Sequence, residues 1–593
     1  MLILTKNILT GNEAISRGFY EAGGLVASSY PGSPTVSILD SMRSYNEIYA
    51  EWGTNEKVAI EISMGASIGG ARSIVSMKHV GINIASDPFM TFTQIKTKGG
   101  FLLVVGDDPG LTSSQNEQDS RFWGKFANIP ILDPSTPQEA KEAVKEGLKL
   151  SEEFNTPVMI RLTSRLCHAR GIVELEDRIE HIPEGFVEDQ SRYCMLPPFA
   201  NAAQHFMKER MVKLEQYNNI NINNKLESKG SSTLIITSSL CYENLKEIDT
   251  NVDILKLAMV WPLPIDYIKT LSEKYERLVV IEETLGFIED ELKIRGLNVE
   301  GKVYFPFTGE ITVESIKIGL KDANILDIEM PLIEKEYAVR RTPMLCSGCP
   351  HRPIFHILKM AKATVIGDIG CYSLGIQEPF EVHKTNISMG ASLGMALGIV
   401  KAQNLSGNKK PIVATIGDGT FFHSGMTGFL QLSSSKENIT VIVMDNRTTA
   451  MTGGQITPTT SEYFKDLGTH SVNIPKVLNS FGIEDVTVVD QFKYNETKKE
   501  ILDAMKRDGL SVIVTTRPCA LNFKVKEPHF YVDSSVCISC RNCIKTNCPP
   551  ISMKLYKGKE KKNSYIDPSS CVGCSVCSQV CPVGAIKRSN IEK

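Results

Sequence analysis

Eight cysteines near the C-terminus are spaced for iron–sulfur chemistry. The first group is Cys537, Cys540, Cys543 and Cys548, and the second is Cys571, Cys574, Cys577 and Cys581. In a C-x2-C-x2-C run followed by Cys-Pro, three thiolates bind one 4Fe–4S cluster and the fourth reaches the other cluster. This rule predicts two ligand sets: Cys537, Cys540, Cys543 with Cys581, and Cys571, Cys574, Cys577 with Cys548.

A zinc site and a disulfide scaffold are the alternatives for these cysteines. Zinc ligands usually come as two separated C-x2-C pairs, whereas here three cysteines follow one another in series. The first group departs from the usual spacing, since four residues instead of three precede Cys548. We expect two 4Fe–4S clusters, and therefore an electron-transfer function for this tail.

A second chemical motif lies at the ends of two apolar segments that are typical of buried strands. The first segment runs into Gly417-Asp418-Gly419, and the second runs into Asp445-Asn446. If the two strands are neighbours in a parallel sheet, Asp418 and Asn446 meet at its carboxyl edge. Carboxylate, amide and carbonyl oxygens suit Mg²⁺, and the glycines let a diphosphate approach the backbone.

This GDG-x26-N segment resembles the diphosphate-binding motif of thiamine diphosphate enzymes. The resemblance implies that Asp418 and Asn446 bind Mg²⁺, with the carbonyl of Thr448 as a third ligand. It also implies that Gly417 and Gly419 lie beside the diphosphate. A Rossmann-type nucleotide site is the alternative, but no G-x-G-x-x-G follows the relevant strand.

Thiamine diphosphate also needs a carboxyl group that bonds its pyrimidine ring. Two glutamates, Glu56 and Glu61, stand at the start of a segment rich in Gly, Ala and Ser. In 2-oxoacid:ferredoxin oxidoreductases the activating glutamate precedes two glycines at spacings that Glu56 matches with Gly65 and Gly81. That resemblance implies Glu56 as the activating group. For either glutamate, a solvated position on a helix is the alternative.

Longer motifs extend the resemblance over nearly the whole chain. They read YPGSP from Tyr30, TNEKVA from Thr54, MKHVG from Met77, CSGCPHR from Cys346, GDGTFFHSG from Gly417 and DNRTTAMTGGQ from Asp445. With the cysteine-rich tail, these motifs are similar to those of the alpha subunits of indolepyruvate:ferredoxin oxidoreductases.

The resemblance also suggests residues for the pocket. Cys349 and His351 would lie beside the cofactor, although a structural role for this histidine is an alternative. Tyr30 and Ser33 would border the substrate, and His79 is a further candidate for the same place. The C-x2-C pair that contains Cys349 has no second such pair nearby, so we expect no metal there.

The fold class implied is α/β. It combines two thiamine-diphosphate-binding domains with doubly wound parallel sheets, a transketolase C-terminal-like α/β domain and a ferredoxin-like domain. The limits expected are 1–185 for the pyrimidine-binding domain, 186–230 for a polar, helix-like segment that ends in an asparagine-rich linker, 231–335 for the transketolase-like domain, 340–525 for the diphosphate-binding domain and 528–593 for the ferredoxin-like domain.

The composition of the chain restricts the class of protein and the cellular compartment to which it belongs. The chain has 593 residues, a net charge of −3 and 42% hydrophobic residues, which is ordinary for a globular protein and does not favour a nucleic-acid partner. No segment approaches the length of a membrane span or a signal-peptide core. Seven further cysteines are scattered, as in reduced cytosolic proteins. We expect a cytoplasmic, anaerobic location.

The activity implied is oxidative decarboxylation of aryl 2-oxo acids with coenzyme A, giving an acyl-CoA and CO₂ while electrons pass to a soluble ferredoxin. Pyruvate or a branched-chain 2-oxo acid is an alternative substrate. A non-oxidative decarboxylase would need no clusters, and a simple electron-transfer module would leave Asp418, Asn446 and Glu56 unexplained. The family also implies a smaller beta subunit, in an α2β2 hetero-oligomer; a self-sufficient homodimer is the alternative.

Overall fold

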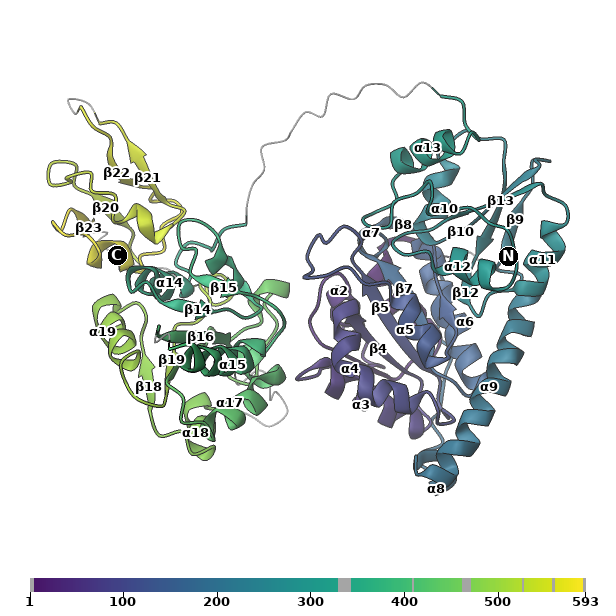
Figure 1. Ribbon diagram of the computed structural model, residues 1–593, viewed down its shortest axis with the longest axis horizontal. Helices are drawn as coiled ribbons and strands as arrows, with labels where there is room; N and C mark the ends of the chain where they lie inside the picture. Colours follow the sequence, from purple (N-terminus) through teal and green to yellow (C-terminus); the bar gives the residue numbers. More distant parts are fainter. Residues whose placement is uncertain are drawn as a thin grey trace. The chain divides into compact units, whose positions relative to one another are not determined.

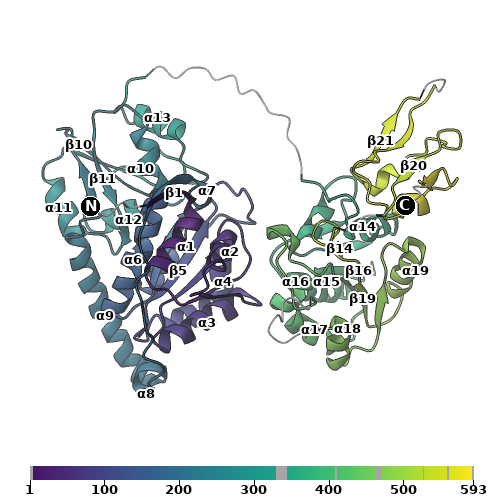
Figure 2. The ribbon, with the colours of Figure 1, turned by 180° about the vertical axis from the view of Figure 1, so that it is seen from behind.

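The computed structural model describes residues 5–328, 343–407, 410–460, 471–524, 527–556 and 560–589. The chain divides into two compact units, Met1–Glu334 and Lys335–Lys593, which Figures 1 and 2 show from opposite sides. The expected domain boundary at 335–340 lies outside the described residues. Within those residues, no helix is long and apolar enough to cross a membrane.

A seven-stranded sheet forms the centre of the first unit. Its strands run in the order β12 (Met259–Trp261), β6 (Ile131–Leu132), β7 (Val158–Thr163), β5 (Phe101–Asp107), β4 (Ser73–Lys78), β2 (Val26–Ser29) and β3 (Tyr49–Trp52). All neighbours are parallel except β12, which pairs antiparallel with β6. All seven residues of β5 are buried because helices cover both faces of the sheet.

Alternate residues of β5 point to opposite faces and meet different helices. Leu103 packs with residues of α3 (Glu56–Ile68) and α4 (His79–Phe92). Leu102 packs on the other face, with α1 (Gly11–Glu21), α2 (Val36–Met42) and α6 (Pro137–Phe154). The strand thus joins two layers of helices, as a doubly wound sheet requires.

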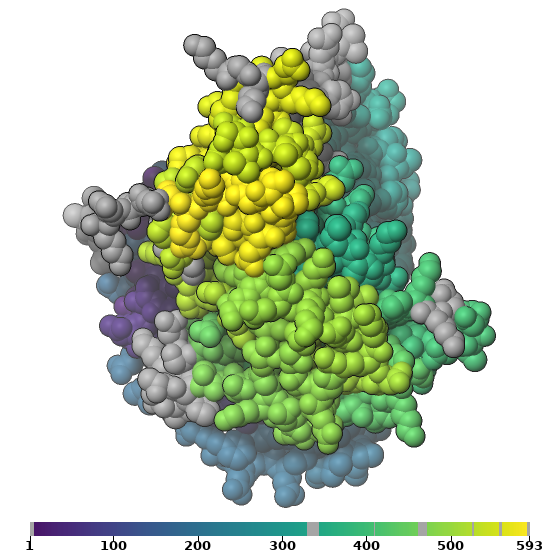
Figure 3. Space-filling model, turned by 90° about the vertical axis from the view of Figure 1, so that its left-hand side faces the viewer, coloured from purple at the N-terminus to yellow at the C-terminus, as the bar shows by residue number. Residues whose placement is uncertain are grey.

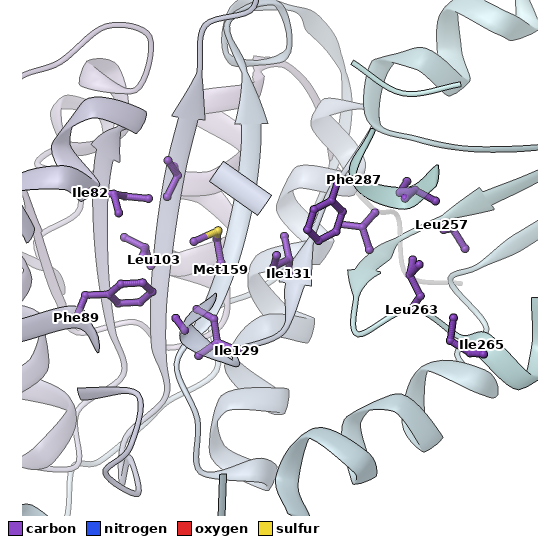
Figure 4. Close-up of a cluster of buried hydrophobic side chains, with 14 of the residues drawn as sticks. Ile82, Phe89, Leu103, Ile129, Ile131, Met159, Leu257, Leu263, Ile265 and Phe287 are labelled. Atoms are coloured by element: carbon purple, nitrogen blue, oxygen red, sulfur yellow. The ribbon is translucent and has the colours of Figure 1, made fainter. Parts of the chain in front are cut away.

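A smaller sheet shares the core of the larger one. Its order is β13 (Arg277–Ile281), β10 (Thr233–Ser238), β11 (Asp253–Leu257) and β9 (Lys225–Glu227). One buried cluster runs from Phe89 and Ile131 to Leu257 and to Phe287 at the start of α12 (Phe287–Ile294), as Figure 4 shows. Burial of this apolar surface stabilises both sheets together.

The segment 186–230 contains the helix that its sequence predicted, but its asparagine-rich end packs into the first unit instead of forming a free linker. Most of this segment is α9 (Pro197–Asn219) followed by β9, which pairs with β11. The fully buried Asn218 donates from Nδ2 to the carbonyls of Met259 at 2.9 Å and Pro262 at 2.8 Å. The asparagine-rich composition reflects buried amides that satisfy main-chain groups, and such groups are almost always paired inside proteins.

The second unit contains a six-stranded parallel sheet. Its order is β15 (His383–Thr385), β14 (Thr364–Ile366), β16 (Ile412–Gly417), β17 (Ile439–Met444), β19 (Leu510–Thr515) and β18 (Val486–Val489). Gly417 and Met444 are direct partners at the ends of β16 and β17. Asp418 and Asp445 therefore leave the sheet side by side at its carboxyl edge.

Within the second unit, the cysteine-rich tail packs against the domain that contains the six-stranded sheet. It contains two antiparallel strand pairs, β20 (Phe530–Val532) with β23 (Ile586–Arg588) and β21 (Ile551–Lys554) with β22 (Asn563–Ile566). Gln579 accepts from the amide of Tyr494 at 3.0 Å and donates to the carbonyl of Phe492 at 2.7 Å. Figure 3 shows the tail, in yellow, lying on the green surface of the same unit.

Candidate cofactor and cluster sites

Three oxygens converge at the carboxyl edge of the six-stranded sheet. The side-chain amide of Asn446 lies 2.9 Å from Oδ1 of Asp418 and 2.8 Å from the carbonyl oxygen of Thr448. With its oxygen turned inward, the amide faces two acceptors and no donor; with its nitrogen turned inward, it donates to both. The first orientation requires a cation between the three oxygens, and these oxygens match the predicted Mg²⁺ ligands.

The carboxylates at this edge lie in the protein interior. Burial raises the pKa of Asp418 to about 7, and the neighbouring charge of Asp445 adds to the rise. Burial likewise raises the pKa of Asp445 to about 6. Thr457 Oγ1 donates to Oδ2 of Asp418 at 2.8 Å, which fixes the carboxylate, and among the described residues no cationic side chain pairs with it. A divalent cation would supply the opposite charge.

Glycines bring the backbone close to its surroundings beside this oxygen group. A Cβ on Gly419 would lie 2.8 Å from Oγ1 of Thr449, and one on Gly417 would lie 2.6 Å from the ring of Tyr372. Any larger residue would displace these neighbours. The predicted diphosphate-binding glycines are thus required by close packing around the site.

A cavity of about 280 Å³ opens beside Asn446. Cys349 and His351, which are predicted to lie beside the cofactor, both line it. His351 is 2% exposed and its Nδ1 has no hydrogen-bond partner. Burial lowers the pKa of His351 to about 4, so the imidazole is neutral at physiological pH. It can therefore exchange hydrogen bonds with a bound molecule without adding charge.

The same cavity brings together four cysteines, a grouping that sequence analysis missed. Cys346, Cys349, Cys371 and Cys519 all line it, and all are free thiols. The C-x2-C pair, for which we expected no metal, thus has two single cysteines near it rather than a second C-x2-C pair. Cys371 follows β14 and Cys519 follows β19, so both enter from the carboxyl edge of the sheet. The position of each of these two cysteines shortly after a parallel strand is the sequence signal that could have predicted the grouping.

The first unit distinguishes the two candidate glutamates. Glu56 is the first residue of α3 and is 7% exposed. A Cβ on Gly81 would lie 2.8 Å from Cγ of Glu56, so the spacing between these residues reflects direct packing. Glu61, in contrast, is exposed and forms an ion pair with Lys57 one turn away. Burial and packing favour Glu56 as the functional carboxyl.

The residues suggested to border the substrate differ in the burial of their side chains and in whether their polar atoms already have hydrogen-bond partners. Tyr30 is 6% exposed and Ser33 is partly buried. His79 is fully buried, with Nδ1 3.3 Å from the carbonyl of Gly106 and Nε2 3.0 Å from that of Asn116. Both ring nitrogens face main-chain groups, which leaves neither for a substrate. The geometry favours a structural role for this histidine.

The tail cysteines lie near one another in two groups. Cys581 lines one small cavity together with Cys537, Cys540 and Cys543. Cys548 lies instead within electrostatic range of Cys571, Cys574 and Cys577, and burial raises its pKa to about 11. Among the described residues, no three His, Cys, Asp or Glu side chains are placed to hold a metal ion.

Two protein-family models match the second unit, one over its six-stranded sheet and the other over its cysteine-rich tail. Residues 368–515 match the thiamine pyrophosphate enzyme C-terminal TPP-binding domain, and residues 531–588 match the 4Fe-4S dicluster domain. The chain is 36% identical to indolepyruvate oxidoreductase subunit IorA of Pyrococcus horikoshii, covering 98% of this chain and 97% of that protein.

One further relative and one solved structure are also similar to this chain. The IorA subunit of Archaeoglobus fulgidus is 35% identical, with 98% and 97% coverage. A solved 2-oxoglutarate:ferredoxin oxidoreductase from Magnetococcus marinus aligns with a TM-score of 0.45 at 15% identity, covering 54% of this chain and 65% of that one.

Asp418→Asn should stabilise the cofactor-free protein at pH 8 by about 1–4 kcal/mol, because a neutral amide replaces a buried charge. The raised pKa means that the folded protein keeps a proton that the unfolded chain loses near pH 4. Wild-type stability is therefore lost as pH rises from about 4 to about 7. Thermal unfolding at pH 5 and pH 8, without magnesium or thiamine diphosphate, measures the effect.

The matched control is Asp508→Asn, which changes an exposed carboxylate in the same unit and should leave unfolding nearly unchanged. Equal loss of stability between pH 5 and pH 8 in wild type and Asp418→Asn would contradict the assignment of this charge.

Proposed function

The chain belongs to the family of indolepyruvate oxidoreductase subunits IorA, and on this basis we propose that it oxidises aryl 2-oxo acids, indolepyruvate among them. It is a thiamine-diphosphate-dependent 2-oxoacid:ferredoxin oxidoreductase subunit with a dicluster ferredoxin domain. In the proposed reaction, the acid and coenzyme A give an acyl-CoA and CO₂, and two electrons pass to ferredoxin.

One observation supports this proposal above the others: the oxygen group and the cysteine tail belong to the same compact unit. Asp418, Asn446 and Thr448 offer a site for Mg²⁺ and diphosphate, while the tail offers two cluster sites. A non-oxidative decarboxylase releases an aldehyde and has no electrons to export. The combination therefore favours oxidative chemistry.

Each residue has a defined part in this proposal. Asp418, Asn446 and the Thr448 carbonyl hold the metal that neutralises the diphosphate, and Glu56 hydrogen-bonds the pyrimidine ring. Thiamine diphosphate, when bound, supplies the electron sink for loss of CO₂. The neutral His351 lines the cavity beside the metal site, where it orients the bound molecules and keeps the cavity free of an added positive charge.

A partner subunit follows from the family. The relatives are named as subunits, and we propose that this chain acts with a smaller beta subunit, as α2β2 in the cytoplasm. A soluble ferredoxin would accept the electrons. The alternatives, a pyruvate or branched-chain enzyme and a self-sufficient homodimer, differ from this proposal in measurable ways.

With the partner subunit present, indolepyruvate, phenylpyruvate and 4-hydroxyphenylpyruvate should each have a kcat/KM at least about tenfold above that of pyruvate or 2-oxoglutarate. The reason is that an aromatic side chain gains apolar contact that a methyl or carboxylate cannot. The assay follows viologen or ferredoxin reduction with coenzyme A. The reconstituted chain alone should be inactive. A preference for pyruvate would reassign the substrate, and full activity alone would remove the partner.

Glu56→Gln should lower kcat by about 10²–10⁴-fold, because the amide cannot exchange a proton with the pyrimidine. Glu61→Gln is the matched control, since it removes an exposed carboxylate one turn and a half further along the same helix. It should retain nearly full turnover. If both variants, or neither, lose activity while still binding the cofactor, Glu56 is not the activating group.

We further propose that the four cavity thiols hold a third iron–sulfur cluster, next to the thiamine diphosphate site. Four cysteines line this cavity, which is the number of ligands that a 4Fe–4S cluster uses, although no three of them are placed to hold a metal ion in this structure. Burial raises the pKa of Cys349 to about 12 and that of Cys371 to about 11, so these thiols need a bound metal to remain thiolates. Such a cluster would receive electrons beside the place where they are released.

Iron content tests this third cluster. The anaerobically purified chain should contain about twelve iron atoms from three four-iron clusters, and Cys371→Ser should lower this to about eight. Cys194→Ser, which changes an exposed cysteine in the first unit, is the control and should lose none. Wild-type iron near eight atoms would restrict the clusters to the tail, and stoichiometric zinc would contradict both assignments.

A further inference from the structure

A buried arginine lies between the cofactor cavity and the cysteine tail. Arg352 is the second residue of α14 (His351–Met360) and is 3% exposed. Its Nε donates to the carbonyl of Cys346 at 3.0 Å, on the cavity side. Its NH1 donates to the carbonyls of Thr546 and Asn547, which directly precede Cys548. One guanidinium thus joins a cavity loop to a tail ligand.

A second contact joins the same two regions. Gly348 adopts a φ of +67°, and a Cβ there would lie only 2.2 Å from Cγ2 of Val572. Val572 follows Cys571 directly in the tail. The loop from 346 to 352 therefore contacts the tail at residues directly adjacent to Cys548 and Cys571, two members of the same predicted ligand set.

The charge of Arg352 has no anionic side chain beside it. Among the residues that the structure describes, no carboxylate forms an ion pair with this guanidinium, and its buried NH2 makes no hydrogen bond. Burial lowers the pKa of Arg352, and the nearby thiols oppose this, Cys548 most strongly. A buried cation with a free donor indicates a missing anion. A cluster ligated by thiolates is such an anion.

We propose that Arg352 is a positioning residue for electron transfer: it stabilises the reduced form of the cluster held by Cys548, Cys571, Cys574 and Cys577. This inference rests on the cluster sets proposed above. Each transfer adds one electron and no proton, so the cluster gains one negative charge. A fixed cation beside it favours that state and raises its reduction potential.

The other tail cluster lacks this feature. Among the residues that the structure describes, the cavity that contains Cys537 and Cys581 is lined, besides its cysteines, by Asn542, Ser564 and apolar residues, with no charged side chain. The two tail clusters should therefore differ in potential. The one next to Arg352 is the easier to reduce, and it is also the one that the cavity loop touches. Electrons leaving the cavity would enter the tail there.

The test compares Arg352→Gln with Arg352→Lys in the intact complex with its clusters. At a fixed solution potential, the Gln variant should lower the reduced-to-oxidised ratio of the adjacent cluster about tenfold, or about 59 mV for one electron. The Lys variant should change it by less than about threefold, or about 30 mV on the same scale. Electron paramagnetic resonance during redox titration gives the ratio for each variant. Cys540→Ser identifies the signal of the other tail cluster, and Cys371→Ser identifies that of the proposed cavity cluster.

Arg588→Gln is the matched control, because Arg588 is an exposed arginine whose NH2 donates to Gly573 in the same tail. Its charge is screened by solvent, so the ratio should change little. If Arg352→Gln loses iron, the Lys variant decides: it must keep both iron and a near-wild-type ratio. An unchanged ratio in the Gln variant, or an equal shift in both variants, overturns the inference. Absence of tail iron in wild type would overturn the cluster sets as well.

Discussion

The parallel pairing of β16 with β17 is the constraint on which the rest of the site depends. Because Gly417 and Met444 are partners in register, the residues that follow them leave the sheet at the same level. A shift of one residue in the register of a strand would turn every one of its side chains to the opposite face of the sheet. The convergence of Asp418 with Asn446 is therefore set by the hydrophobic core, and the metal-binding geometry follows from how two apolar strands pack.

Burying the charged groups of this site costs electrostatic free energy, which other contacts in the fold do not offset. Two buried carboxylates, Asp418 and Asp445, lie close enough for the first to feel the charge of the second. Proteins tolerate such strain where function needs it. The contrast with Arg352 is instructive, since one place has excess negative charge and the other an unmatched positive one. Each is complementary to a cofactor of opposite sign.

Sequence alone predicted what is local and missed what depends on the path of the chain. The tail cysteines and the GDG segment have fixed spacings, so their chemistry could be read directly. Cys371 and Cys519 stand alone in sequence and meet only through strand order. The choice between Glu56 and Glu61 needed burial, which a segment rich in small residues does not reveal. The asparagine-rich end of the segment 186–230 was interpreted as a linker because the sequence does not show the main-chain partners of the buried Asn218.

The shared core of the two sheets in the first unit has a consequence for how this protein can evolve. Strand β12 lies in the sequence of the smaller sheet but completes the larger one, and Phe287 packs into the same apolar cluster as Phe89. Gene fission between the two would expose an unpaired edge and a broad apolar face. We therefore expect recombination among related enzymes to exchange this unit as a whole. The described strands of the tail pair only with one another, so the tail is more easily transferred between proteins.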